Sequence, residues 1–257
     1  ADMIELLKVL VCLPFLAYSC YSDIKTRRVS NKVWPIMLGA ASPFILYEMI
    51  TFGLPYIFRT VISFVVIFVF VYILFMLHAF GGADAKVLMV ISIILPVFPE
   101  LSLGSLQLPL WGVPLLDLFT FSVFGNSVLL TIIVPLGLLL YNLLTVPPKE
   151  LMKKPLYALI GYRQHIDNLE EGHFRMIEKH EETPNGVVSR FTRTGTSIDR
   201  DMILKLQGLH RKGSIGEHVW ITPGLPFMIP ITAGFLAAVI FGDLIFYLSF
   251  NYLMPLV

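Results

Sequence analysis

The chain has 257 residues, of which 56% are hydrophobic and 14% charged, and its formal net charge is +1. A soluble domain is typically about 25% charged, so this composition excludes an ordinary soluble protein, and the small net charge does not indicate a nucleic-acid partner. Several apolar runs reach the roughly 20 residues needed to cross a bilayer, and the mean hydropathy is +0.77. The two cysteines, Cys12 and Cys20, both fall in the first run and indicate small buried side chains rather than a disulfide framework.

Six transmembrane helices are predicted, and both chain ends are expected on the outer side of the membrane. They cover residues 4–21, 33–51, 56–77, 85–95, 118–144 and 225–252. The chain start lacks the basic region and A-x-A site of a cleavable signal peptide, so the first run is expected to be a membrane helix. The loop 23–32 holds four basic residues, which places it on the cytoplasmic side. Residues 100–117 contain no Lys or Arg and are expected to form an outer loop, partly re-entrant.

The composition turns polar after residue 146, which predicts a small, mainly β cytoplasmic domain. The expected domains are therefore 1–146 (helices one to five), 147–219 (the soluble domain) and 220–257 (helix six). Within the soluble domain, four stretches are expected to be extended: 157–166, 174–180, 187–194 and 218–222. Asn185-Gly186 favours a hairpin turn, and residues 199–209 have the apolar spacing of a helix.

The stretch Phe80-Gly81-Gly82-Ala83-Asp84-Ala85-Lys86 is a short polar interruption between two long apolar runs. A carboxylate at the edge of a membrane segment is costly, and it is a functional-site hypothesis by default. The two preceding glycines allow a turn or the close approach of another backbone. The alternative is a tight loop in which Asp84 is a solvated helix cap.

Asp23 ends the first predicted helix and Asp84 begins the fourth, both on the predicted cytoplasmic face. Two carboxylates at neighbouring helix ends can share one water, because an ionised carboxylate accepts its proton while a protonated one polarises a carbonyl. Which of the two is acid and which is base stays open, since a coupled pair titrates as a unit. The alternatives are an interfacial role for Asp23 beside the four cations and a positive-inside anchor for Lys86. No metal site is predicted, because the neighbourhood offers too few His or Cys ligands.

Two motifs resemble those of the type IV prepilin peptidases, which are GxGD aspartyl proteases. The pattern Asp-x-x-x-x-Arg-x-Ser-Asn at residues 23–31 is similar to the first motif, and Gly-x-x-Asp-x-Lys at residues 81–86 to the second. Ala83 stands where bacterial members usually have glycine, and in this the chain resembles the archaeal preflagellin peptidase branch. Nothing similar to the cysteine-rich zinc-binding domain of many bacterial members is found.

The resemblance implies a membrane aspartyl endopeptidase that removes the short basic leader from preflagellin or pilin-like precursors at the cytoplasmic face, without methyl transfer. Asp23 and Asp84 carry over as the catalytic pair. Substrate binding or motif support is expected from five further residues: Gly81, Gly82, Ala83, Lys86 and Pro226. The implied partners are the precursor and the lipid bilayer, with no nucleic acid, no metal and no cofactor.

Two other functions are compatible with the residues alone. A proton-coupled transporter would use the same carboxylates as a relay, and a non-catalytic scaffold would bind partners through the soluble domain. Five acidic residues in that domain either attract a basic leader or form a solvated face: Glu170, Glu171, Glu178, Glu181 and Glu182.

Overall fold

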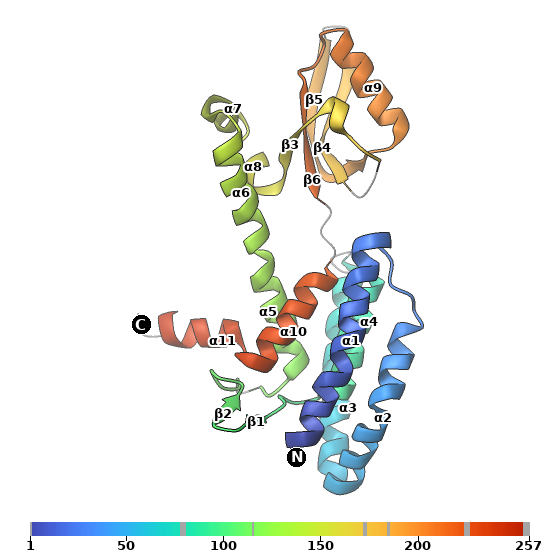
Figure 1. The fold of residues 1–257 in the computed structure, drawn as a ribbon, viewed down its shortest axis with the longest axis vertical. Coiled ribbons are helices and arrows are strands. Elements are labelled where there is room, and N and C mark those ends of the chain that lie inside the picture. The colour runs from blue at the N-terminus through green and yellow to red at the C-terminus, as the bar shows by residue number, and fades with distance from the viewer. Residues whose placement is uncertain are drawn as a thin grey trace. The chain divides into compact units, whose positions relative to one another are not determined.

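The computed structural model describes residues 2–77, 81–114, 116–171, 174–183, 186–223 and 227–253 (Figure 1). The chain divides into two compact units. The helical unit consists of Ala1–Thr131 and Pro226–Val257, and the sheet unit consists of Ile132–Leu225.

The helical unit is built from long apolar segments that are continuous enough to form helices. Its helices are α1 (Asp2–Thr26), α2 (Val33–Phe52), α3 (Leu54–Met76), α4 (Gly82–Ile94), α5 (Phe119–Thr131), α10 (Met228–Ile240) and α11 (Leu244–Leu248), followed by a π-helical turn (Ser249–Leu253). Gly53, at φ 63°, ends α2, and Pro55 lies in the first turn of α3. Glycine tolerates this conformation and proline is accepted at a helix start, so one short turn joins the two helices.

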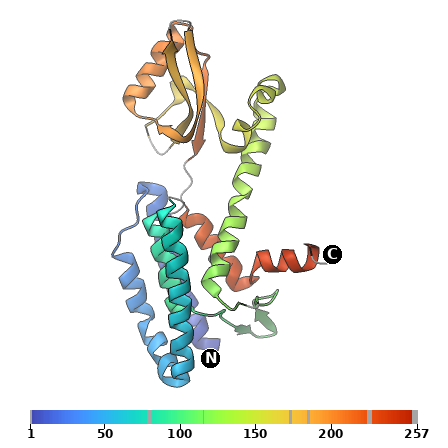
Figure 2. The same ribbon diagram turned by 180° about the vertical axis from the view of Figure 1, so that it is seen from behind.

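The core of the helical unit forms around α4, which packs against α3 and α2 (Figure 2). Val87, Leu88 and Ile91 are completely buried there. A second contact joins α10 to α5, where the Phe235 ring meets the Phe119 ring edge-on at 5.5 Å. Because α1 packs against both α2 and α10, it connects the two groups of helices.

Four stretches are long and apolar enough to cross a membrane: Met3–Thr26, Val33–Phe52, Leu54–Met76 and Phe119–Thr145. A fifth span results if Met228–Ile240 and Leu244–Asn251, which are bent by 63°, count as one. The described chain therefore has the helices of a membrane protein, but the predicted six spans are not confirmed. The 13 residues of α4 extend only about 20 Å, less than the hydrocarbon thickness of about 30 Å. The membrane orientation stays a prediction.

Two boundaries in the helical unit differ from the sequence prediction. The first helix continues to Thr26 instead of ending at residue 21, so Asp23 lies inside its last turn. The Thr26 hydroxyl donates to the Ser22 carbonyl at 2.9 Å, and the helix ends where Arg27 turns to φ 54°. The predicted outer loop contains a short hairpin, β1 (Leu101–Leu103) and β2 (Leu106–Leu108), which the sequence analysis missed.

Side chains of α5 form hydrogen bonds with backbone groups at the bend between α10 and α11. The Asn126 amide donates to the Gly242 carbonyl and accepts from the Leu244 N–H, both at 2.9 Å. The Ser122 hydroxyl donates to Asp243 at 2.5 Å, and Asp243 in turn caps α11 through the Phe246 N–H. Backbone groups freed by a broken membrane helix need such partners, because lipid offers none.

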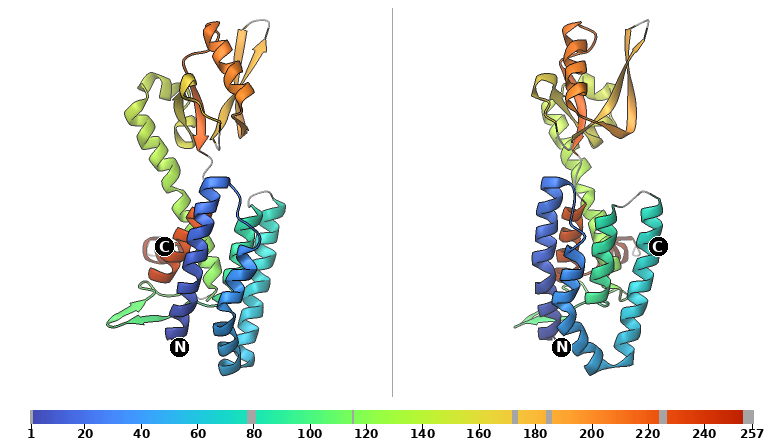
Figure 3. Two further views of the ribbon diagram at one scale, coloured as in Figure 1. Left: turned by 45° about the vertical axis from the view of Figure 1, so that its right-hand side comes forward. Right: turned by 90° about the vertical axis from the view of Figure 1, so that its right-hand side faces the viewer.

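The sheet unit combines short helices with a four-stranded antiparallel sheet. Its elements are α6 (Ile133–Thr145), α7 (Pro148–Lys153), α8 (Tyr157–Ile160), β3 (Tyr162–His165), a 3₁₀ turn (Ile166–Asn168), β4 (Phe174–Thr183), β5 (Gly186–Ser197), α9 (Arg200–Arg211) and β6 (His218–Pro223). The strand order is β3-β6-β4-β5. Helix α9 lies along one face of the sheet (Figure 3), and its Leu206 and Leu209 are buried.

The predicted β content of this region is confirmed, with one correction. The hairpin of β4 and β5 closes with Thr183 opposite Gly186, although residues 184 and 185 lie outside the described ranges. Residues 157–160, expected to be extended, form the helix α8, which ends at Gly161. A Cβ on Gly161 would lie 2.4 Å from the Ile221 carbonyl oxygen, so this glycine permits the close approach of β6.

The crossing of α5 and α10 predicts a strong effect of adding a side chain at Gly234. A Cβ there would lie 2.3 Å from the Ser127 Oγ and 2.6 Å from the Val123 carbonyl oxygen. We expect Gly234→Ala to lower the free energy of unfolding by about 1–3 kcal/mol through overpacking, measured by thermal unfolding in detergent. Gly39→Ala is the control, because nothing lies within 4 Å of its Cβ position. Equal stability of the two variants would contradict the packing described.

Candidate functional site

Asp23 lies in the last turn of α1, half-buried and directed at the start of α10. Its Oδ2 accepts a long hydrogen bond of 3.4 Å from the Met228 N–H. One turn earlier, the Cys20 thiol donates to the Met228 carbonyl at 3.3 Å and lies 3.0 Å from the Thr232 hydroxyl. Two successive turns of α1 are thus joined to the first turns of α10, and this contact fixes where the Asp23 carboxylate lies.

Asp84 lies in the first turn of α4, where it reaches back to the residue before the helix. The Gly81 N–H donates to the Asp84 Oδ2 at 3.2 Å, which caps the helix. A Cβ on Gly81 would lie 2.9 Å from that same oxygen, so the absence of a side chain lets the carboxylate fold back. Nothing lies within 4 Å of the corresponding position at Gly82. Ala83 is half-buried against the core.

The two aspartates lie within electrostatic reach of each other. Asp84 is outside the four candidate spans. Burial raises the pKa of the Asp84 carboxyl to about 6, the Gly81 amide lowers that pKa, and the negative charge of Asp23 raises it. A carboxyl with this pKa is protonated in part near neutral pH. The arrangement therefore places a carboxyl with a raised pKa beside a second carboxyl group.

Lys86 joins the two sequence motifs directly. Its Nζ donates to the Asn31 Oδ1 at 2.7 Å, although the two residues are 55 positions apart. The loop that carries Asn31 is folded back on α1, because the hydroxyls of Ser22 and Thr26 both donate to the Arg28 carbonyl, at 2.7 and 3.0 Å. The sequence analysis did not pair Lys86 with Asn31; the signal available was only that each belongs to one of the two motifs.

The remaining predicted residues are Pro226 and the acidic group of the sheet unit. Pro226 lies outside the described residues, and α10 begins at Met228. Of the acidic group in the sheet unit, Glu178 is buried in an ion pair with Lys154, so it is not part of a solvated acidic face. Glu181 is paired with Lys179 at 3.1 Å.

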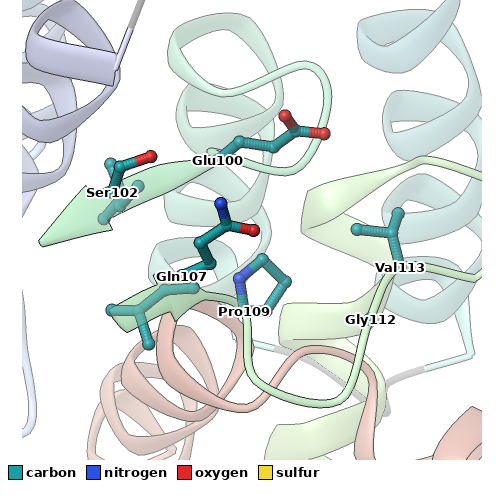
Figure 4. Close-up of a pocket in the computed structure, with 8 residues that line it drawn as sticks. Glu100, Ser102, Gln107, Pro109, Gly112 and Val113 are labelled. Atoms are coloured by element: carbon teal, nitrogen blue, oxygen red, sulfur yellow. The ribbon is translucent and has the colours of Figure 1, made fainter. Parts of the chain in front are cut away.

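Figure 4 shows a pocket of about 280 Å³ at the β1–β2 hairpin. Its polar lining comes from Glu100, Ser102 and Gln107. The hairpin lies beside the N-terminal end of α1 (Figure 1), whereas Asp23 lies in the last turn of that helix. This pocket therefore does not belong to the candidate site. Within the described ranges, no three His, Cys, Asp or Glu side chains are grouped so that they would hold a metal ion.

Two family profiles match the chain. The profile described as the Type IV leader peptidase family matches residues 10–162, which include both aspartates. The profile described as Archaeal Peptidase A24 C-terminus Type II matches residues 153–244. Together they extend from α1 through the sheet unit and α10 to the first residue of α11.

Three curated relatives are similar over most of their length, and each is named preflagellin peptidase. The Methanococcus voltae protein is 28% identical over 231 residues, covering 89% of this chain and 92% of the relative. The Methanococcus maripaludis protein is 27% identical over 233 residues, with the same coverage. The Methanocaldococcus jannaschii protein is 23% identical over 230 residues, covering 86% and 88%.

The bond between Lys86 and Asn31 predicts a coupled loosening of both loops when it is removed. A hydrogen bond to a charged group is worth about 1.5–3 kcal/mol, less at an exposed position. We expect Lys86→Met to raise amide exchange in residues 27–32 and in the first turn of α4 about fivefold, which corresponds to roughly 1 kcal/mol. Lys32→Met is the control, because it removes a cation from the same loop without removing this bond. Unchanged exchange in Lys86→Met would show that the bond does not hold the loops.

Proposed function

Because the chain belongs to the type IV leader peptidase family, we propose that it is a membrane aspartyl endopeptidase that cleaves the leader peptide from preflagellin or pilin-like precursors. The names of its relatives support this substrate class. The observation that carries the aspartyl mechanism is the electrostatic pairing of Asp23 with a partly buried Asp84 at the ends of two helices. The basic loop 23–32 supports placing this site at the cytoplasmic face.

In the proposed mechanism, Asp23 is the base and Asp84 the acid. Asp23 accepts an N–H at the start of α10, where the helix dipole favours negative charge. Asp84, whose pKa burial raises to about 6, acts in its protonated form. Asp23 takes a proton from a water, the resulting hydroxide attacks the scissile carbonyl carbon, and Asp84 gives its proton to the carbonyl oxygen. The C–N bond then breaks as the amine leaves with the proton held by Asp23, and collapse of the intermediate returns a proton to Asp84.

The peptide must be extended for this attack, since a helical substrate hides its amide bonds. The open space at Gly82, next to the acid, supports close approach of a substrate backbone there. An extended segment can pair with exposed backbone groups in the manner of an added strand. Lys86 and Asn31 act through their mutual bond, which ties the loop after Asp23 to the helix of Asp84.

A proton-coupled transporter is not favoured. Both matching families are peptidases, and the two aspartates lie at helix ends. A relay through the membrane would need titratable groups along its depth.

The aspartyl mechanism predicts that Asp23→Asn and Asp84→Asn each reduce cleavage at least about 10³-fold, as expected when an essential catalytic group is removed. The assay measures cleavage of a preflagellin-like precursor by membranes that hold each variant at equal folded amount. Asp199→Asn is the matched control: Asp199 caps α9 in the sheet unit, and asparagine caps equally well. Cleavage retained in either catalytic variant would refute the pair.

The assignment of Asp84 as the acid also predicts the pH dependence of the rate. Because the protonated form of Asp84 is the active one and its pKa is about 6, kcat/KM falls as the pH rises through about 6. The measurement is kcat/KM between pH 5 and 8 on a peptide without titratable side chains next to the cleaved bond. The pH profile then reports ionisation of the enzyme and not of the substrate. A rate that rises across this range would reverse the assigned roles.

A further inference from the structure

A second group of charged side chains lies inside the helical unit, away from the aspartates. Lys8 of α1 is only 1% exposed, and its Nζ lies 2.6 Å from the Glu48 Oε2 of α2. The Tyr56 hydroxyl of α3 donates to the same Glu48 oxygen at 2.5 Å. The Lys8 ammonium also lies 5.8 Å from the centre of the Tyr56 ring. These three residues, which we call the ionic clamp, connect three helices at one point.

We propose that the ionic clamp positions the two aspartates. It does so by fixing where α1 lies along its own axis relative to α2 and α3, the helices that pack against α4. This inference rests on the proposed function. Lys8, Glu48 and Tyr56 touch no reacting atom and are positioning residues.

The clamp lies on the same helix as Asp23 but at its other end. Lys8 and Asp23 are 15 positions apart, which corresponds to about 22 Å along a helix. Helices α2 and α3, which hold the other two clamp residues, both pack against α4, which holds Asp84. A slip of α1 by one turn would move Asp23 by about 5.4 Å relative to Asp84, far beyond the tolerance of a shared water.

Apolar packing alone does not determine this axial position of α1, because similar aliphatic side chains recur along all three helices. Beside the clamp, a cavity of about 350 Å³ is lined by Glu5, Glu48 and Tyr56 together with Arg59. Beside this cavity, the polar bonds of Lys8 and Tyr56 to Glu48 join α1, α2 and α3. Burying a charged lysine is costly unless it is paired, and a buried pair contributes more to a specific arrangement than to stability.

Because of Pro14, α1 needs a second point of attachment away from Asp23. Pro14 lies in α1 between the clamp and Asp23 and removes one backbone hydrogen bond. The segment beyond it is tied to α10 through Cys20 and Asp23. The segment before it is tied to α2 and α3 through Lys8. Both ties are therefore needed to hold α1 in one place.

The test compares three clamp variants of the full-length protein with wild type: Lys8→Met, Lys8→Arg and the double variant Lys8→Met/Glu48→Met. Each is purified in detergent, normalised to folded protein, and assayed for kcat and KM on a preflagellin-like precursor. We expect Lys8→Met to lower kcat at least tenfold with KM changed less than twofold, and Lys8→Arg to regain part of the loss because it keeps the charge. Glu5 also pairs with Lys8, at 3.1 Å, so the double variant additionally carries Glu5→Gln. No carboxylate is then left without its cation, and this variant should fold as well as wild type but keep the low kcat.

The position of α1 is measured independently of cleavage. Spin labels at Lys25→Cys on α1 and Leu77→Cys at the end of α3, both exposed, are placed in a Cys12→Ala/Cys20→Ser background, in which the serine hydroxyl can replace the thiol as donor to the Met228 carbonyl. We expect one narrow distance distribution with the clamp intact and a broad one in the double variant. Arg59→Gln is the control, because it removes a cation that lines the same cavity but is outside the clamp.

Either of two results in the double variant would overturn the inference: wild-type kcat, or an unchanged distance distribution. An equal loss of kcat in Arg59→Gln would also overturn it, because local charge rather than the clamp would then be responsible. If wild type cleaves no precursor while the double variant broadens the distances, the proposed function fails and the effect of the clamp on α1 stands.

Discussion

The structure of the helical unit depends on the position of α1, which is held at both ends by polar contacts. At one end Asp23 and Cys20 meet the first turns of α10, and at the other Lys8 meets α2 and α3. In a bundle surrounded by lipid, apolar side chains gain little by preferring one neighbour to another, since the solvent is equally apolar. Polar groups do discriminate, because leaving one unpaired is costly. A small number of polar contacts therefore has a large effect on how the helices of this bundle are arranged.

The same reasoning explains why charges are found at the site at all. Asp23 and Asp84 are stabilised by backbone N–H groups at helix starts rather than by opposite charges. An ion pair would lower the pKa of both carboxyls, whereas burial beside a second acid raises the pKa of Asp84. The proposed mechanism uses that difference between two chemically identical groups. The glycine before Asp84 lets the carboxylate bend back to the backbone, so the local turn and the electrostatics come from the same few residues.

Much of this arrangement was predictable from the sequence, and the exceptions have physical causes. The long helices were predicted from the hydrophobic runs, and the hairpin was predicted from the turn preference of Asn185-Gly186. Helix ends were missed where no glycine or proline marks them, as in α1, which runs past Asp23. The ties of Lys86 to Asn31 and of Lys8 to Glu48 join residues 55 and 40 positions apart. Such pairings depend on which helices are neighbours, and no local pattern encodes that.

The division of the chain also bears on how the sheet unit can be separated from the rest. The boundary falls after Thr131, inside a continuous apolar stretch, so α6 belongs with the sheet. The buried amide of Asn142 in α6 donates to the carbonyls of Ala158 and Gly161, at 2.9 and 2.7 Å. A fragment cut at the polar boundary near residue 147 would leave both carbonyls without this donor. The sheet unit thus depends in part on an apolar helix, and an exchange of this unit between related proteins would have to include that helix.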